Sequence, residues 1–385
     1  MDLSYILNHL GEDRENYFNA VSPPMMLSSN FAFGSVSKMR AELEHELETP
    51  FYTRGYNPTV AILRKKIAAL EGAEDALVFS SGSAAVAAAV MSCVKAGDHV
   101  VCADKPYSWT RTLLGNYLAK YGAEVTYVVG SDAAGFEAAI RPNTKLIYLE
   151  SPNSLTFELQ DIRAVSAVAK KHNIPVAIDN SYNSPLNQSP IELGADLVIH
   201  SATKYLNGHS DVIAGVVAGS RERIAKMMAE EYMTLGAVVG AHDAWLMIRG
   251  MRTLELRVNR SAASALQLAE FLQSHPKVEK VYYPYLKSNA DFELAKLQMK
   301  RGGGLLSVLL RAEDVKQVER FCDSLQRFLL ATSWGGHESL CFPMCALRAS
   351  ASFTNPLPWN LVRLYVGLED ADVLQGDLEQ ALGRM

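Results

Sequence analysis

Three short polar segments follow apolar runs and have the residue types that chemistry needs. The first, Ser80-Ser81-Gly82-Ser83, follows the apolar run 76–79 and opens a segment rich in alanine and valine. Because the first N–H groups of a helix are unpaired and lie at the positive end of its dipole, such a turn can bind a phosphate. A Ser/Gly turn before a helix is by itself more often a simple cap. The segment therefore predicts an anion site only in combination with other groups.

Lys204 and Asp179 are the other groups. Lys204 comes just after the apolar run 197–200, and a desolvated lysine there has a lowered pKa and can form a Schiff base. Asp179 ends the preceding apolar run 25 residues earlier, and a buried aspartate keeps a pyridine nitrogen protonated as an electron sink. Singly, Lys204 would be interpreted as a surface lysine and Asp179 as a helix N-cap. Phosphate turn, aspartate and lysine in this order predict a site for pyridoxal 5′-phosphate (PLP).

The elements that must bring these groups together follow from the apolar pattern. Short continuous apolar runs alternate with helical stretches, and the runs are 76–79, 99–102, 125–129, 146–149, 176–179 and 197–200. Continuous apolar strands separated by helices indicate a mainly parallel sheet covered on both faces, in an α/β sandwich. Ligands of such sheets bind at the carboxyl ends of the strands, where all three polar segments lie.

The chain divides into three parts by its pattern. Residues 1–50 carry Pro23-Pro24 and weak periodicity, so they are expected to form an arm rather than a core layer. Residues 51–245 hold the alternating pattern and are expected to form a large PLP-binding domain. Residues 246–385 predict a smaller C-terminal α+β domain. Its segments are a helical pattern at 254–274 and apolar runs at 278–283, 305–310 and 361–366.

The composition narrows the classes of protein and partner. The 385 residues suggest two domains, and 49% hydrophobic with 21% charged residues is ordinary for a globular protein. The net charge of -5 comes from interspersed charges, so nucleic acid is not indicated, and no apolar run is long enough to span a membrane. Five cysteines without a CxxC pair indicate reduced thiols, and core packing explains Cys341 and Cys345 better than a metal does. We therefore expect a cytoplasmic protein that acts on a small molecule and binds no metal.

At the polar segments the sequence resembles the Cys/Met-metabolism family of PLP enzymes, which includes cystathionine γ-synthase, cystathionine β- and γ-lyases and methionine γ-lyase. The most specific match runs from His200 to Asp211 and is similar, nearly residue for residue, to the family's cofactor-lysine signature. Further matches are Tyr52-Thr53-Arg54, Asn57-Pro58-Thr59, Ser80-Ser81-Gly82, Glu150-Ser151-Pro152, Asp179-Asn180 and the segment from Ser333 to Leu340. The resemblance covers almost the whole chain and implies PLP-dependent transferase fold type I, with a mainly parallel seven-stranded sheet between helices and a smaller C-terminal α+β domain.

The resemblance also implies roles for single residues. Lys204 would hold the cofactor and act as general base, Asp179 would pair with the pyridinium nitrogen, and Tyr107 would stack on the ring and exchange a proton with the substrate. The other expected contacts are the phosphate ligands Gly82, Ser83, Ser201 and Thr203, the substrate ligands Ser333, Trp334 and Arg363, and the pair Tyr52 and Arg54, which would reach the phosphate of a neighbouring subunit. The implied assembly is a homotetramer, a dimer of dimers in which two chains share each active site. Without the lysine signature, Tyr107 would be interpreted as an ordinary aromatic at a helix start, Arg363 as a charge at a strand edge, and the Tyr52/Arg54 pair as part of a solvated loop.

The sequence leaves the reaction open. Asn153-Ser154-Leu155 and Trp334 stand where γ-acting members commonly carry Thr-Asn-Pro and leucine, and both are similar to some β-lyases. The stretch from Tyr52 to Thr59 instead looks like the γ-synthase and γ-lyase branch. We expect a carbon–sulfur lyase that acts on a sulfur amino acid such as L-cystathionine by β-elimination, with γ-elimination or γ-replacement as the alternative. A non-catalytic PLP-binding regulator is disfavoured because Lys204, Asp179 and Tyr107 are all present, and a dinucleotide enzyme because no G-x-G-x-x-G follows the first apolar run.

Overall fold

The larger of two β-sheets carries the polar segments. The computed structural model describes residues 1–347 and 357–385, and in this part of the chain seven strands form one sheet in the order β1-β7-β6-β5-β4-β2-β3. The strands are β1 (Asp75–Phe79), β2 (His99–Ala103), β3 (Glu124–Val128), β4 (Thr144–Glu150), β5 (Val176–Asp179), β6 (Leu197–Ser201) and β7 (Gly215–Gly219). Strands β2 to β6 pair in parallel, and β7 pairs antiparallel with β1 and β6. The expected α/β class with a mainly parallel sheet is confirmed.

Helices cover both faces of this sheet because its strands are apolar on both sides. The helices of this part are α1 (Leu3–Asn8), α2 (Val36–Leu43), α3 (Pro58–Glu71), α4 (Gly82–Met91), α5 (Ser108–Thr112), α6 (Ala133–Ala138), α7 (Ile162–Lys171), α8 (Ser184–Asn187), α9 (Arg221–Met227), α10 (Met233–Leu235) and α11 (Ala241–Met251). Short 3-10 helices span Arg14–Tyr17 and Leu118–Tyr121, and π-helical turns span Leu113–Tyr117 and Met228–Tyr232. Helices α4 and α9 pack on one face, and α3, α6 and α7 pack on the other.

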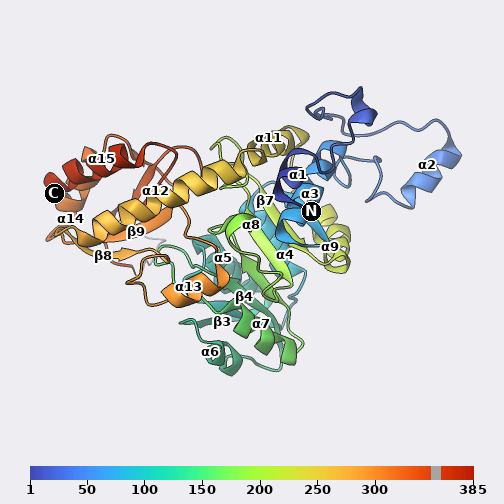
Figure 1. The fold of residues 1–385 in the computed structure, drawn as a ribbon. Helices are drawn as coiled ribbons and strands as arrows, with labels where there is room; N and C mark the ends of the chain where they lie inside the picture. The colour runs from blue at the N-terminus through green and yellow to red at the C-terminus, as the bar shows by residue number, and fades with distance from the viewer. Residues whose placement is uncertain (348–356) are drawn as a thin grey trace.

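The C-terminal part has its own sheet and core. Among the described residues its strands lie in the order β10-β11-β12-β9-β8. They are β8 (Val278–Tyr282), β9 (Leu305–Leu310), β10 (Leu329–Leu330), β11 (Leu340–Pro343) and β12 (Leu361–Tyr365), accompanied by α12 (Leu254–Ser274), α13 (Phe292–Gln298), α14 (Val315–Ser324), the 3-10 helix Met344–Leu347 and α15 (Ala371–Gly383). Helices α12, α14 and α15 bury apolar residues against this sheet, and α12 runs from the end of α11 to the C-terminal helices (Figure 1). The smaller C-terminal α+β unit is confirmed, whereas the boundary at residue 245 falls inside α11 and the division into ranges stays a prediction.

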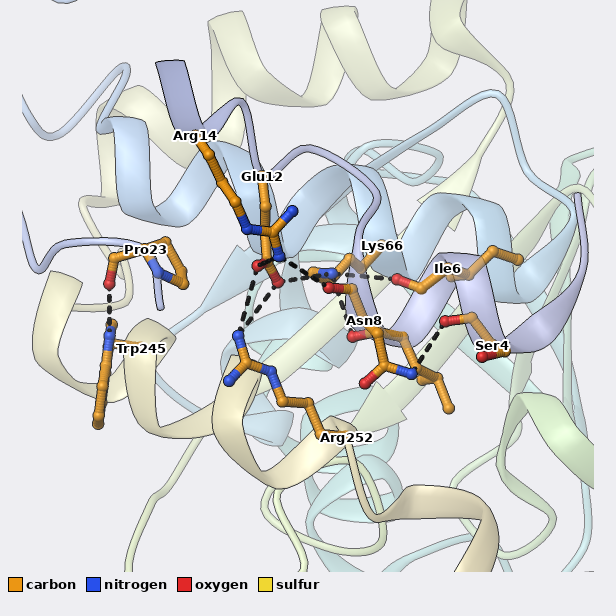
Figure 2. A network of polar contacts seen from close by, with 10 residues as sticks. Ser4, Ile6, Asn8, Glu12, Arg14, Pro23, Lys66, Trp245 and Arg252 are labelled. Carbon is orange, nitrogen blue, oxygen red and sulfur yellow. Dashed lines mark hydrogen bonds and ion pairs between the residues drawn. The ribbon is translucent and has the colours of Figure 1, made fainter. Parts of the chain in front are cut away.

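A buried cluster of charged side chains holds the first residues of the chain against α3 (Figure 2). The Lys66 ammonium on α3 lies 3.1 Å from a Glu12 carboxylate oxygen and donates to the backbone oxygens of Ile6 and Leu7. Arg14 and Arg252 also contact the Glu12 carboxylate, at 2.9 Å and 3.3 Å. The side chains of Lys66 and Glu12 are fully buried, and Leu7 joins the core beside α3. The first residues of the chain thus pack against α3 and the core of the larger domain.

Part of the expected arm extends away from the body. Residues 23–26 still contact it, since the Trp245 indole N–H donates to the Pro23 carbonyl at 2.8 Å and the Thr59 hydroxyl donates to the Pro24 carbonyl at 3.1 Å. Helix α2 has no buried residue, and Figure 1 shows it far from the sheets. A helix without a buried face gains little from packing and is held only by local hydrogen bonds. In the described residues, no helix combines the length and the apolar content that a membrane crossing requires.

Candidate active site

Strands β4, β5 and β6 end side by side and bring the central polar residues to one edge of the sheet. Glu150, the last residue of β4, lies opposite Asp179, the last residue of β5, and Asp179 lies opposite Ile199 of β6. Lys204 follows β6 after one further turn, in which its N–H donates to the Ser201 carbonyl at 3.0 Å. The sequence-based expectation that Asp179 and Lys204 share one edge agrees with this register.

The Lys204 amine is partly buried and has defined partners. Its Nζ donates to the Ser333 hydroxyl at 2.5 Å and lies 5.4 Å from the centre of the Trp334 ring. Burial, and then the Arg363 charge, lower the pKa of Lys204 to about 8, against the opposing effect of Asp179. Such an amine is partly neutral near neutral pH, and a neutral lysine can act as nucleophile or as base.

Asp179 is buried and held by a serine that the sequence analysis did not single out. One carboxylate oxygen accepts hydrogen bonds from the Ser181 N–H at 2.9 Å and the Ser181 hydroxyl at 2.6 Å. The Ser181 hydroxyl also accepts from the Ser201 N–H at 2.6 Å, which links β5 to β6. Burial raises the pKa of Asp179, while the Ser181 hydrogen bonds and the nearby His200 and Lys204 lower it. An aspartate side chain commonly accepts a hydrogen bond from the backbone N–H two residues later, in an Asx-turn. The spacing of Asp179 and Ser181 is the signal for Ser181 in the sequence.

The predicted phosphate turn forms the N-terminus of α4 and packs against the end of β6. Ser81 caps the helix by accepting a hydrogen bond from the Ala84 N–H at 3.1 Å. A Cβ at Gly82 would lie 2.9 Å from Ser201, so only glycine permits this approach. Thr203 is engaged elsewhere, because its hydroxyl donates to the Ala214 carbonyl at 3.2 Å and accepts from the Ala214 N–H at 3.0 Å. The helix terminus and Ser201 adjoin, while Thr203 faces its own loop.

The loop at Ser333 joins the amine to the partly buried Arg363. Arg363 on β12 donates to the Ser333 carbonyl at 3.0 Å, and the Ser333 hydroxyl accepts from Lys204. Burial lowers the pKa of the Arg363 guanidinium to about 10. Ser333 has a φ of 73° and Gly335 has a φ of 90°, in the left-handed region. A Cβ at Gly335 would lie 2.8 Å from the Lys204 Cα, so the loop is pressed against the lysine.

Tyr107 begins α5 beside the same edge. Its N–H donates to a Glu150 carboxyl oxygen at 2.6 Å, and the other Glu150 oxygen accepts from the Ser154 hydroxyl at 2.7 Å. Burial, followed by the charges of Asp179 and Glu150, raises the pKa of the Tyr107 phenol, while a hydrogen bond with Ser83 lowers it. Sequence reasoning noticed Glu150 as part of a motif but gave it no role.

Tyr52 and Arg54 lie apart from this group. The Arg54 guanidinium lies 5.7 Å from the centre of the Tyr52 ring, and both side chains are exposed. In the part of the chain that the structure describes, Arg54 forms no ion pair, and the pair does not contact Lys204, Asp179 or α4 of the same chain. The structure brings most of the other predicted residues to the sheet edge that carries Lys204, but the Thr203 hydroxyl is engaged with Ala214, and Tyr52 and Arg54 lie apart.

The comparisons with known proteins agree on one family. The family model described as Cys/Met metabolism PLP-dependent enzyme matches residues 5–383. L-methionine gamma-lyase from Pseudomonas deceptionensis is 41% identical over 98% of this chain and 96% of its own length. Cystathionine gamma-synthase from Mycobacterium tuberculosis is 39% identical over 97% of this chain and 95% of its own length. The solved structure of metB from Corynebacterium glutamicum superposes with a TM-score of 0.93 at 36% identity, covering 100% of this chain and 98% of that one.

The residues present fit PLP. A helix N-terminus that only glycine allows to approach Ser201 suits the phosphate. The buried Asp179 carboxylate suits a protonated ring nitrogen, and the partly buried Lys204 amine with its lowered pKa suits the aldehyde carbon. Family model, relatives and fold agree with this chemistry, and the chain belongs to the Cys/Met metabolism PLP-dependent enzyme family.

Proposed function

We propose that this enzyme cleaves or exchanges the γ substituent of a sulfur amino acid, with γ-elimination as its main reaction. The contact chain from Lys204 through Ser333 to Arg363 carries the proposal, since it joins a base for Cα to a clamp for the α-carboxylate. The choice of the γ position is supported by the names of the relatives, methionine gamma-lyase and cystathionine gamma-synthase. The β-elimination expected from Asn153-Ser154-Leu155 and Trp334 is therefore the second candidate rather than the first.

Each residue has a chemical task in this proposal. PLP, when bound, withdraws electrons from the substrate Cα and so makes its hydrogen acidic. Lys204 removes the Cα proton as general base, and a second proton must leave Cβ before the γ sulfur can depart. Arg363 holds the α-carboxylate, and Tyr107 supplies a proton to the departing thiolate. The Trp334 ring, which packs edge-on against Tyr205 at 5.5 Å and lies over the Lys204 amine, limits the space beside the base.

The products of L-cystathionine test the choice between γ and β. γ-Elimination with one water gives 2-oxobutyrate, cysteine and ammonia, whereas β-elimination gives pyruvate, homocysteine and ammonia. We expect 2-oxobutyrate as the main keto acid, and 2-oxobutyrate with methanethiol from L-methionine, whose sulfur sits on Cγ. Pyruvate from cystathionine together with no reaction on methionine would establish the β-lyase instead.

Arg363→Lys should weaken substrate binding without unfolding the protein. Lysine keeps the positive charge but loses the planar fork, so a loss of about 1.5–3 kcal/mol is expected for one charge-assisted hydrogen bond. Substrate titration should show a higher KM with nearly unchanged cofactor absorbance. The matched control is Arg260→Lys, an exposed arginine on α12 paired with Asp370 at 3.6 Å, which should behave as the parent does. An unchanged KM in Arg363→Lys would contradict the carboxylate role.

The proposed assembly is a homotetramer with active sites shared between two chains. Its support is the pair Tyr52 and Arg54, whose side chains are exposed and adjacent to each other. Mixing Arg54→Ala chains with Lys204→Ala chains should restore part of the activity, because one site of each hybrid dimer would have both residues intact. Hybrids purified through two different tags should be assayed. Absence of recovery in such hybrids would place the phosphate contacts within one chain.

We also propose a cytoplasmic location. All five cysteines are free, and the sulfurs of Cys322 and Cys341 lie 3.7 Å apart without a bond. Disulfides persist in oxidising compartments, so a close unbonded pair supports a reducing one.

A further inference from the structure

We propose that Glu150 is a positioning residue, which fixes Tyr107 in the active site by accepting the hydrogen bond of its backbone N–H. The inference rests on the proposed role of Tyr107 and adds a residue to which no role has been given. It concerns a contact between the end of β4 and the start of α5, beside Asp179.

The first support is the geometry of Glu150. Its side chain ends β4 and is buried, and both carboxyl oxygens have donors of normal geometry, the Tyr107 N–H at 2.6 Å and the Ser154 hydroxyl at 2.7 Å. The Ser154 contact holds one oxygen and so turns the other toward Tyr107. A carboxyl held on a strand is a rigid support, because strand ends move less than loops.

The second support is that Tyr107 has few other anchors. It is the N-cap of α5, a helix of five residues, and its side chain does not cap that helix. The residue is 41% exposed, so packing alone does not fix it, and its phenol has a hydrogen bond with Ser83 but, within the described chain, none to the sheet. In the described residues, its carbonyl accepts from the Arg111 N–H at 3.0 Å within the same short helix, which leaves Glu150 as the hydrogen-bond partner that ties its backbone to the sheet.

The third support is the unfavourable free energy of burying Glu150 beside Asp179. Glu150 lies opposite Asp179 in the register of β4 and β5, and burial together with the Asp179 charge raises the pKa of Glu150 to about 8. Two buried carboxyls side by side oppose folding. Their presence therefore suggests that they serve another purpose. A contact that holds Tyr107 is such a purpose.

Two variants separate the contact from the acid group. Glu150→Gln keeps the length and an amide oxygen for the Tyr107 N–H but removes the titratable carboxyl. Glu150→Asp keeps a carboxyl but is shorter by one methylene, so it loses the reach to Tyr107. We expect Glu150→Asp to lower kcat by about tenfold or more, within the range of general acid–base contributions, and Glu150→Gln to stay within about threefold of the parent.

A cycle with Tyr107→Phe tests whether Glu150 acts through Tyr107. Residues that act as one unit have non-additive effects. Tyr107→Phe should lower kcat by about 10²-fold in the parent but by only about tenfold in Glu150→Asp, since the misplaced phenol has already lost about tenfold of its contribution. Fully additive losses would mean that Glu150 serves the fold alone and would overturn the proposal.

Cofactor binding supplies a readout that does not depend on turnover. If Tyr107 stacks on the ring, equilibrium titration of the apoprotein with PLP should show weaker binding for Glu150→Asp and parent-like binding for Glu150→Gln. Glu158→Asp is the control, because Glu158 lies in the following loop, pairs with Lys105 at 2.7 Å and does not touch Tyr107. Parent-like affinity and kcat in Glu150→Asp, or equal damage in Glu150→Asp and Glu150→Gln, would overturn the inference. Failure of the proposed function would appear separately, in the keto acid formed by the unmutated enzyme.

Discussion

Replacing Lys204 with alanine should lower turnover by about 10³-fold or more, since proton transfer by a positioned side chain alone contributes about 10²- to 10⁴-fold. The loss has two causes. The partly buried amine is the group that can bond the cofactor, and it is also the base placed for the Cα proton. Its pKa, lowered to about 8, keeps a fraction of the amine neutral near neutral pH. An alanine side chain can perform neither function.

The measurement is single-turnover kinetics with purified apoprotein and added PLP, alongside the absorbance of the bound cofactor. Lys296→Ala is the matched control, because Lys296 is an exposed lysine paired with Glu293 on α13. It should leave both absorbance and turnover unchanged. A Lys204→Ala protein that keeps the parent's absorbance and turns over within tenfold of the parent would refute the proposed role of Lys204.

Asp179→Asn should reduce kcat by about 10²- to 10³-fold, the loss seen when one preorganised electrostatic group is removed from an active site. Asparagine keeps the shape and can still accept the Ser181 hydrogen bonds, so the fold should persist. It cannot balance a positive ring nitrogen, so the electron sink weakens.

The same sheet offers the control for Asp179→Asn. Asp196 precedes β6 at the opposite edge, where its carboxylate accepts from the Val176 N–H at 2.8 Å, so Asp196→Asn tests the loss of an aspartate from the same layer without touching the site. Thermal unfolding should be compared for both variants. Near-parent turnover in Asp179→Asn, with normal folding, would remove Asp179 from the cofactor site.

The strands that the sequence predicts best are those with continuous apolar runs. The six runs from 76–79 to 197–200 correspond to β1 through β6, and 254–274 corresponds to α12. The apolar pattern did not reveal β7, whose run Gly-Val-Val-Ala-Gly is bounded by glycines, residues depleted in strands. Strands β10 and β11 were also missed, since β10 has only two residues and β11 ends in Pro343.

The site residues also divide into those whose placement the sequence predicts and those whose contacts it does not predict. Asp179 and Lys204 could be brought together from sequence because parallel strands end at a common edge, which needs no knowledge of side-chain contacts. The contact between Lys204 and Ser333 joins residues 129 positions apart and depends on how the C-terminal part packs on the sheet. The engagement of Thr203 with Ala214, and of Glu150 with Tyr107, likewise follows from local packing that residue types alone do not specify.

Chemical trapping of the cofactor tests the central claim most directly. Borohydride reduces an imine to a stable amine, so PLP bound through a lysine becomes permanently attached to it. Digestion and mass spectrometry of the reduced holoenzyme should locate the added mass on the peptide that contains Lys204, and added substrate should diminish the labelling by displacing the lysine. Attachment to a different lysine, or no attachment at all in protein saturated with PLP, would contradict the assignment of Lys204 and the mechanism built on it.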